Sequence, residues 1–264
     1  MKKFLAIMLV VAIAAAFSAC GGSTEPENTT APEITTNPEI VTEAEPVDGQ
    51  LAGGYTIKDT AAVELPEEVK EAFDLALADY TGIGLTPIAY LGSQVVAGKN
   101  YAVLCLGKVL NPTAQPSLKV AVIYKDLEGN ASILRVNDFN LADYAGANDE
   151  PAEGEDAASE VSSIGGIAGG WILNTEYPEA VLDDGEKAAC GVFEGVMGAH
   201  YEPIACLATQ VVAGINYVML TKVTVPAADD AVELKVVTVY SGVDGSLDVI
   251  GTKTVDLASI AGLI

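Results

Sequence analysis

Basic residues are scarce in this chain, and histidine is nearly absent. The 264 residues include 13 lysines and arginines against 37 aspartates and glutamates, a formal net charge of −24. Such an excess of negative charge disfavours binding to nucleic acid or to an anionic lipid surface. The single histidine, His200, belongs to no metal-ligand spacing and no catalytic Ser/His/Asp set, and the sequence has no phosphate-cradling glycine loop. We therefore expect a protein that is not an enzyme and needs no cofactor or metal.

The apolar run near the start of the chain is too short to span a bilayer. Phe4–Phe17 comprises 14 apolar residues behind two lysines, whereas a spanning helix needs about 20. Phe17–Cys20 then resembles a bacterial lipobox, in which the cysteine is lipidated and the peptide is cut before it. We expect residues 1–19 to be a lipoprotein signal peptide and Cys20 to anchor the exported chain at the outer face of a bacterial membrane. The alternative is an ordinary secretory signal cut near Ala19.

Two acidic stretches, residues 20–49 and 147–164, contain no lysine or arginine. Segments with few apolar residues and charges of one sign bury too little surface to offset the entropy lost on ordering the chain. We expect residues 20–49 to be a disordered acidic tether and residues 147–164 to be an acidic linker between two folded domains.

The rest of the sequence contains one pattern twice, at an offset of 116 residues. Gln-Val-Val-Ala-Gly occurs at Gln94–Gly98 and again at Gln210–Gly214. The same register, without a gap, aligns Gly53-Gly54 with Gly169-Gly170, Pro87–Ala89 with Pro203–Ala205, Asn100-Tyr101 with Asn216-Tyr217, Leu118–Val120 with Leu234–Val236, and Tyr124 with Tyr240. A fixed period of this kind indicates two copies of one structural unit. We expect the first domain at residues 50–146 and the second at residues 165–264.

The cysteines do not follow this repeat. Cys105, Cys190 and Cys206 each align with a residue of another type at the offset of 116. A disulfide framework common to both copies is therefore excluded. We expect reduced cysteines packed as small apolar groups, while a Cys190–Cys206 bridge within the second copy stays open.

Each copy has the pattern of one helix followed by strands. In the first copy, Pro66 and two glutamates open a segment with apolar residues at helical spacing. Strand-like segments follow at residues 86–96, 99–109, 118–124 and 132–136, and glycine-containing turns separate them as in hairpins. The predicted fold class is α+β, with two tandem domains that each pack one helix on a curved antiparallel sheet of about four to five strands.

Several of these segments together resemble one family. Gln-Val-Val-Ala-Gly-Xaa-Asn-Tyr, at Gln94–Tyr101 and Gln210–Tyr217, resembles the first binding hairpin of the cystatins, which inhibit papain-like cysteine proteases. Gly53–Asp59 is similar to the N-terminal glycine segment of plant cystatins, and Gly169–Trp171 keeps its Gly-Gly-Trp. Leu118–Gly129 resembles the fourth strand and second hairpin of the stefin branch. The resemblance covers each copy nearly end to end and implies two tandem cystatin-like domains.

In that family, the glycine segment and both hairpin tips form a wedge that fills the cleft around the protease's Cys–His pair. The resemblance implies that the following residues bind a protease: Gly53, Gly54, Gln94, Val95, Val96, Ala97, Gly98, Leu127, Glu128, Gly169, Gly170, Trp171, Gln210, Val211, Val212, Ala213, Gly214, Val243 and Asp244. The second tips depart from the Pro-Trp of animal secretory and plant members, since they read Asp-Leu-Glu-Gly and Gly-Val-Asp-Gly. Stefins also lack that tryptophan.

The resemblance implies reversible, wedge-type inhibition of papain-like cysteine proteases, and the lipobox-like sequence at Cys20 implies that the inhibitor is exported and membrane-anchored. The alternative is a cell-surface binding module with the same fold that inhibits nothing, because one fold hosts many roles. The expected partners are a protease and, through the lipid on Cys20, a membrane, but no nucleic acid.

Overall fold

The structure is a computed structural model that describes residues 54–57, 65–109, 111, 113–149, 170–176, 182–226 and 231–262. Residues 1–53, and with them the predicted signal peptide, tether and lipidated Cys20, lie outside the described residues. All the helices and strands described below belong to one compact unit, Ala44–Ile264. The predicted domain boundaries stay predictions.

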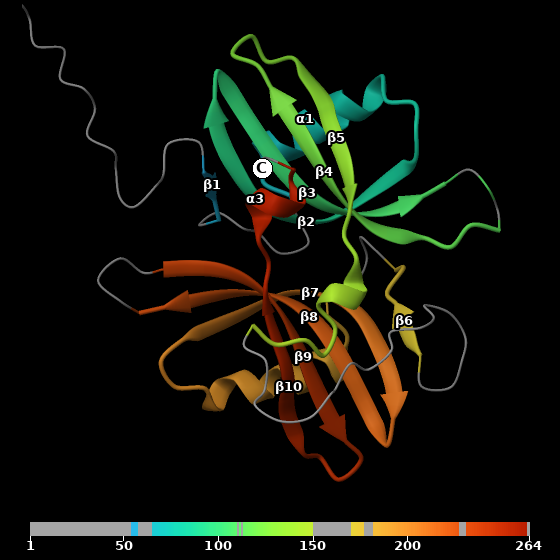
Figure 1. The fold of residues 1–264 in the computed structure, drawn as a ribbon, viewed down its shortest axis with the longest axis vertical. Coiled ribbons are helices and arrows are strands. Elements are labelled where there is room, and N and C mark those ends of the chain that lie inside the picture. Colours follow the sequence, from blue (N-terminus) through green and yellow to red (C-terminus); the bar gives the residue numbers. More distant parts are fainter. Residues whose placement is uncertain are drawn as a thin grey trace, which may run out of the picture. The chain divides into compact units, whose positions relative to one another are not determined.

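Repeat 1, residues 54–149, forms a five-stranded antiparallel sheet in the order β1-β2-β3-β4-β5 (Figure 1). Its elements are β1 Tyr55–Thr56, α1 Glu67–Ala78, β2 Gly84–Val96, β3 Gly98–Lys108, β4 Ser117–Lys125, β5 Ala131–Asp138 and the 3-10 helix η1 Leu141–Asp143. Helix α1 begins directly after Pro66, and two acidic residues in its first turn complement the helix dipole. Each strand pairs with the next one in the chain, so the whole sheet is a meander.

Repeat 2, residues 170–262, forms a second five-stranded antiparallel sheet in the order β10-β9-β8-β7-β6. Its elements are β6 Trp171–Leu173, α2 Asp184–Cys190, the 3-10 helix η2 Gly191–Gly195, β7 His200–Val212, β8 Gly214–Val225, β9 Ala231–Gly242, β10 Leu247–Thr254 and α3 Leu257–Ile260. Strands β7 and β10 have the bounds of β2 and β5 shifted by 116 residues. The register shifts of β2, at Pro87/Ala89 and Tyr90/Gly92, recur in β7 at Pro203/Ala205 and Cys206/Ala208.

The central strands of each sheet are buried on both faces. On one face of repeat 1, the apolar side of α1, including Ala72 and Phe73, packs on alternate residues such as Tyr101 and Val103 of β3. On the corresponding face of repeat 2, Ala189 and Phe193 pack on Met219 and its neighbours. The opposite faces of both sheets contribute to a single apolar cluster, which we call the shared core.

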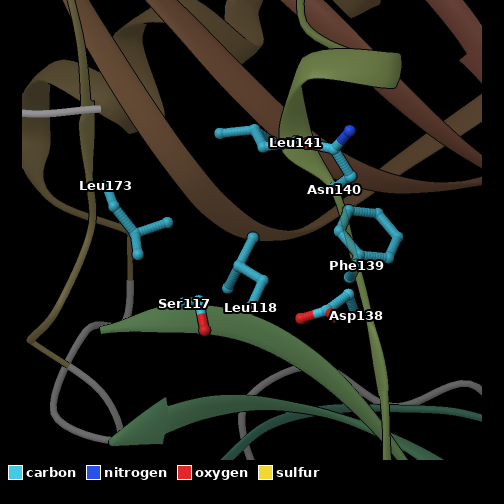
Figure 2. A pocket seen from close by; sticks show the side chains of 7 residues that line it. All are labelled: Ser117, Leu118, Asp138, Phe139, Asn140, Leu141 and Leu173. Atoms are coloured by element: carbon cyan, nitrogen blue, oxygen red, sulfur yellow. The ribbon is translucent and has the colours of Figure 1, made fainter. Parts of the chain in front are cut away.

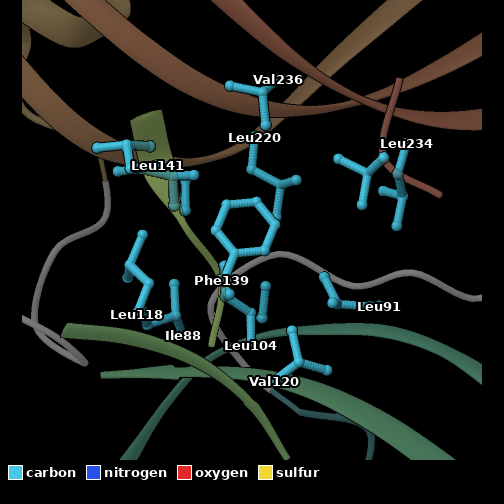
Figure 3. Packing of buried hydrophobic residues seen from close by; sticks show 14 of the residues in the cluster. Ile88, Leu91, Leu104, Leu118, Val120, Phe139, Leu141, Leu220, Leu234 and Val236 are labelled. Atoms are coloured by element: carbon cyan, nitrogen blue, oxygen red, sulfur yellow. The ribbon is translucent and has the colours of Figure 1, made fainter. Parts of the chain in front are cut away.

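The shared core joins the two repeats. Leu104 and Val120 of the first sheet and Leu220 and Val236 of the second belong to it, all almost completely buried. Figure 3 shows Phe139 between the side chains contributed by the two sheets. Burial of this apolar surface from water is the main force that holds the repeats together.

The predicted fold class, an α+β fold of two tandem domains that each pack one helix on their own sheet, is wrong. Strands predominate, the two sheets share a core, and the described residues contain three short α-helices with 12, 7 and 4 residues. The helix expected in the second copy ends at Cys190 and continues only as a 3-10 helix between Gly191 and Gly195, because glycine disfavours a helix interior by about 1 kcal/mol. The C-terminal helix α3 was not predicted.

The ends of the two repeats cross over to each other's sheet. At the end of repeat 1, the Gly146 amide donates to Thr238 Oγ1 of β9 at 2.9 Å, and Asn148 bridges to Thr252 of β10. At the end of repeat 2, the Ile260 carbonyl accepts a hydrogen bond from Asn137 Nδ2 of β5 at 2.8 Å. The end of each repeat therefore contacts the edge strand of the other repeat's sheet.

Candidate functional site

In each repeat, both hairpin turns and the start of the first strand lie at one end of the sheet. We call Gly54, Val95–Gly98 and Asp126–Gly129 rim 1, and Gly170, Val211–Gly214 and Gly242–Gly245 rim 2. Tyr55 pairs with Gln94 beside the first turn of rim 1, and Trp171 pairs with Gln210 in the same way at rim 2. Gly53 and Gly169 lie outside the described residues, but the glycine that follows each of them is at its rim.

The two turns of each rim touch at a glycine. A Cβ atom on Gly98 would lie 2.4 Å from the carbonyl oxygen of Lys125, and one on Gly214 would lie 2.3 Å from that of Ser241. These glycines also have φ values of +126° and +145°, which residues with a side chain rarely adopt. Glycine is thus required here for both the backbone conformation and the close approach of the second hairpin.

Aliphatic side chains stand exposed on both rims. Leu127 is 86% exposed and Val95 66% exposed at rim 1, while Val243 is 91% exposed and Val211 60% exposed at rim 2. Val96 and Val212 are exposed as well. A cluster of exposed aliphatic groups on a stable protein indicates an interaction surface.

The second turns are held by acidic side chains. The Asp126 carboxylate accepts hydrogen bonds from the backbone amides of Glu128 and Asn130, at 2.9 and 2.8 Å, and from the Asn130 side chain. The hydrogen bond from the Asn130 side chain is the main cause that lowers the pKa of Asp126. The hydrogen bond from the Ser246 backbone lowers the pKa of Asp244. Both tips therefore stay negatively charged at neutral pH, next to an exposed aliphatic residue.

Three large side chains that the resemblance assigns to protease contact are buried or half-buried. Gln94 is buried and accepts a hydrogen bond from Asn100 Nδ2 at 2.7 Å, and Gln210 is half-buried and accepts one from Asn216 Nδ2 at 2.8 Å. Trp171 is buried in the shared core, which Tyr55 also contacts. Burial raises the pKa of Tyr55 to about 12. The structure thus places these side chains under the rims rather than on them.

Tyr124 and Tyr240 hold the two turns of each rim together, a role that no motif predicted. Their hydroxyl groups donate to the carbonyl oxygens of Ala97 and Ala213, at 2.6 and 2.7 Å. Both tyrosines recur at the repeat offset, and that recurrence was the signal available in the sequence.

The other candidate groups do not form a second site. Cys105, Cys190 and Cys206 are free, so the bridge left open between the last two is not formed. Among the described residues, no group of histidine, cysteine, aspartate or glutamate side chains is placed to hold a metal ion. In the same part of the chain, no helix has both the length and the apolar character required to cross a membrane.

A pocket of about 360 Å³ lies away from the rims (Figure 2). Its lining consists of Ser117 and Leu118 at the start of β4, Asp138 at the end of β5, Phe139–Leu141 directly after β5, and Leu173 of β6. Ser117 lies at the opposite end of β4 from the Asp126 turn. Asp138 is the one charged residue in this lining, and it forms an ion pair with Lys119.

Comparison with protein-family models, curated proteins and solved structures found no match to this chain. The geometry of the rims is therefore the basis for the functional proposal.

Proposed function

We propose that this chain is an exported inhibitor of papain-like cysteine proteases that acts by inserting a rim into the active-site cleft. The observation that carries the proposal is the convergence of three separate backbone segments, with exposed aliphatic side chains, at one end of each sheet. A cleft that is lined by apolar groups would bury Val95, Val96 and Leu127 on rim 1, or their counterparts on rim 2.

A preformed rim suits reversible occlusion. The turns are fixed by glycine backbone geometry and by hydrogen bonds within each repeat. Little chain entropy is lost when such a surface binds, so modest apolar contacts can give tight association. The lipobox-like sequence at Cys20 supports a role at a membrane surface. Together these features favour a tethered binder whose rims reach proteases near that membrane.

The test is titration of papain, followed with a fluorogenic peptide, by the full chain without its signal peptide. We expect inhibition at micromolar concentration or below. A variant with Val96→Asp and Val212→Asp, one change per rim, should weaken inhibition by about tenfold or more, because it places a carboxylate where apolar contact is needed. Leu75→Asp is the matched control, since Leu75 is an exposed aliphatic residue on α1, outside both rims.

A folded wild-type chain that leaves papain fully active at micromolar concentration would contradict the proposal. The rims would then belong to a non-inhibitory surface binding module. The acidic residues at the tips, Asp126, Glu128 and Asp244, are the feature that favours this second function, because they would have to be desolvated or paired on entering a cleft.

A further inference from the structure

One tyrosine in each repeat ties the first hairpin turn to the second hairpin. Tyr124 is the penultimate residue of β4, and its hydroxyl donates to the Ala97 carbonyl in the β2–β3 turn. Tyr240 of β9 does the same to Ala213 in the β7–β8 turn. These carbonyl oxygens belong to exposed turn residues. The tyrosine hydroxyl is thus a fixed partner for a group that would otherwise bond to mobile water.

The aromatic ring of each tyrosine also contacts the turn, in addition to the hydrogen bond from its hydroxyl group. A Cβ atom on Gly98 would lie 3.0 Å from Tyr124 Cε2, and one on Gly214 would lie 2.9 Å from Tyr240 Cε2. Each ring therefore packs against the turn glycine with no room for a side chain between them. The absence of a side chain at these glycines lets the tyrosine reach the carbonyl.

A row of directly opposed residues includes the tyrosine and crosses the base of the first hairpin. Asn100 lies directly opposite Tyr124 on the neighbouring strand and opposite Gln94 on the other side. Asn216 lies in the same way between Gln210 and Tyr240. Directly opposed residues of an antiparallel pair have their side chains on the same face of the sheet. The Asn–Gln hydrogen bond in each row holds the two arms of the first hairpin at the base of the turn.

We propose that Tyr124 and Tyr240 are positioning residues that lock the first turn against the second and so present each rim as a single rigid edge. The exposed valines of the first turn and Leu127 or Val243 of the second then enter a partner together. We call the hydrogen bond from the tyrosine hydroxyl to the turn carbonyl the latch. Without it the two turns can move separately, so binding to a partner must order them again. The identity of the partner rests on the proposed function, but the latch itself does not.

The experiment compares Tyr124→Phe and Tyr240→Phe in the full chain without its signal peptide. Each change removes one hydroxyl and keeps the ring. NMR relaxation should show the backbone order parameters of Ala97 and Gly98 falling in Tyr124→Phe from about 0.85 toward 0.6, while Ala213 and Gly214 stay unchanged. Tyr240→Phe should give the reverse pattern. Each repeat thus serves as the internal control for the other.

Dissociation from papain gives the second readout. Loss of one neutral hydrogen bond that holds the rim should speed release from the affected rim by about threefold to tenfold. To isolate one rim, Tyr124→Phe is measured in a Val212→Asp background and Tyr240→Phe in a Val96→Asp background. Tyr144→Phe, which removes a hydroxyl from the ring stacked on Phe139, should leave both rims and their release rates as they were.

Order parameters that stay unchanged in both latch variants would overturn the proposal, whatever papain does. If the wild type binds papain, and the variants have more mobile turns but release papain no faster, the positioning role is overturned. If the wild type does not bind papain, the inhibitor function fails, and the order parameters alone decide whether the latch exists.

Discussion

Lys99 and Lys125 lie opposite each other at the base of rim 1, whereas Ile215 and Ser241 hold the same places at rim 2. Lys99 pairs with Glu68 of α1 at 3.1 Å, and Lys125 approaches Glu71 at 3.8 Å. The two rims thus have the same backbone pairing with different side chains around it. The base of rim 1 is therefore charged and paired with α1, whereas the base of rim 2 carries one aliphatic and one hydroxyl side chain.

The ends of the two repeats also differ in the side chains that hold them, although both contact the other sheet. The end of repeat 1 reaches β10 through Asp149, whose carboxylate accepts hydrogen bonds from the Thr254 amide and hydroxyl. The end of repeat 2 reaches β5 through backbone carbonyl oxygens that accept from Asn137 and from Arg135, the only arginine of the chain. One crossover depends on an ionisable acid and the other does not, although the strands of the two sheets pair in the same order. Backbone geometry is therefore the shared property, and charge is where the repeats diverged.

The largest expected effect on stability comes from the shared core, where we expect the two repeats to behave alike. Leu104 and Leu220 are repeat counterparts that are fully buried in it. Replacing either one by alanine should lower the free energy of unfolding by about 2–5 kcal/mol, because each leaves a cavity in a closely packed interior. Both sheets should unfold in a single transition in each variant. Urea denaturation, followed at amides of both sheets, measures this.

Leu75→Ala on the exposed side of α1 is the control, with an expected change within about 0.5 kcal/mol. A sheet that keeps its wild-type midpoint while the other shifts would show that the shared core does not couple the repeats.

A smaller effect is expected from pH, because only the crossover at the end of repeat 1 should weaken in acid. Burial acts to raise the pKa of Asp149, but hydrogen bonds from Thr254 and the charge of Lys235 outweigh it and lower this pKa below its ordinary value of 3.8. Because the folded-state pKa is the lower one, the contact is stabilising above about pH 4 and is lost as the pH falls through the folded-state pKa. Lys235 also pairs with Glu233, and Lys253 lies 3.8 Å from Asp149.

The protection of the Thr254 amide against hydrogen exchange, taken relative to the intrinsic exchange rate at each pH, should therefore fall in acid, while the protection of the Asn137 amide beside the other crossover should show no matching step. Asp149→Asn should abolish the acid step at Thr254. An equal acid step at both positions would mean that global unfolding, rather than this carboxylate, sets the pH response.

The smallest expected effect on stability comes from exchanging the residue that differs at the base of the two rims. Lys99→Ile gives rim 1 the residue of rim 2 and removes the ion pair with Glu68, whose two side chains are each about half exposed. The free energy of unfolding should change by less than about 0.5 kcal/mol, because water and salt screen such pairs. Urea unfolding at low and high ionic strength is the measurement. In a double-mutant cycle with Glu68→Gln, a coupling above about 1 kcal/mol would contradict this expectation.

Much of the local structure could be read from the sequence. Strand-like segments at residues 86–96 and 99–109 correspond to β2 and β3, because a glycine turn between apolar segments leaves few other local conformations. The repeat offset transferred that result to the second half without new information. The meeting of both hairpin turns at one end of a sheet also follows from a meander of antiparallel strands.

The burial of particular side chains could not be read in the same way. Gln94 and Trp171 look like surface contacts in the motif, but the first is enclosed by the hydrogen-bonded row below the rim and the second by the shared core. Consecutive apolar residues such as Ala102–Leu106 indicate that both faces of a strand are covered. They do not say whether a helix or another sheet covers them.

The amino-acid sequence determined that this protein has two copies of one hairpin frame, because glycine positions and the apolar period act locally and recur at a fixed offset. The tertiary structure decided that the two sheets share a core, that the repeat ends cross over, and that a tyrosine reaches each turn carbonyl. Those contacts join residues that are distant in the chain, and their energies depend on packing between surfaces that no local pattern specifies.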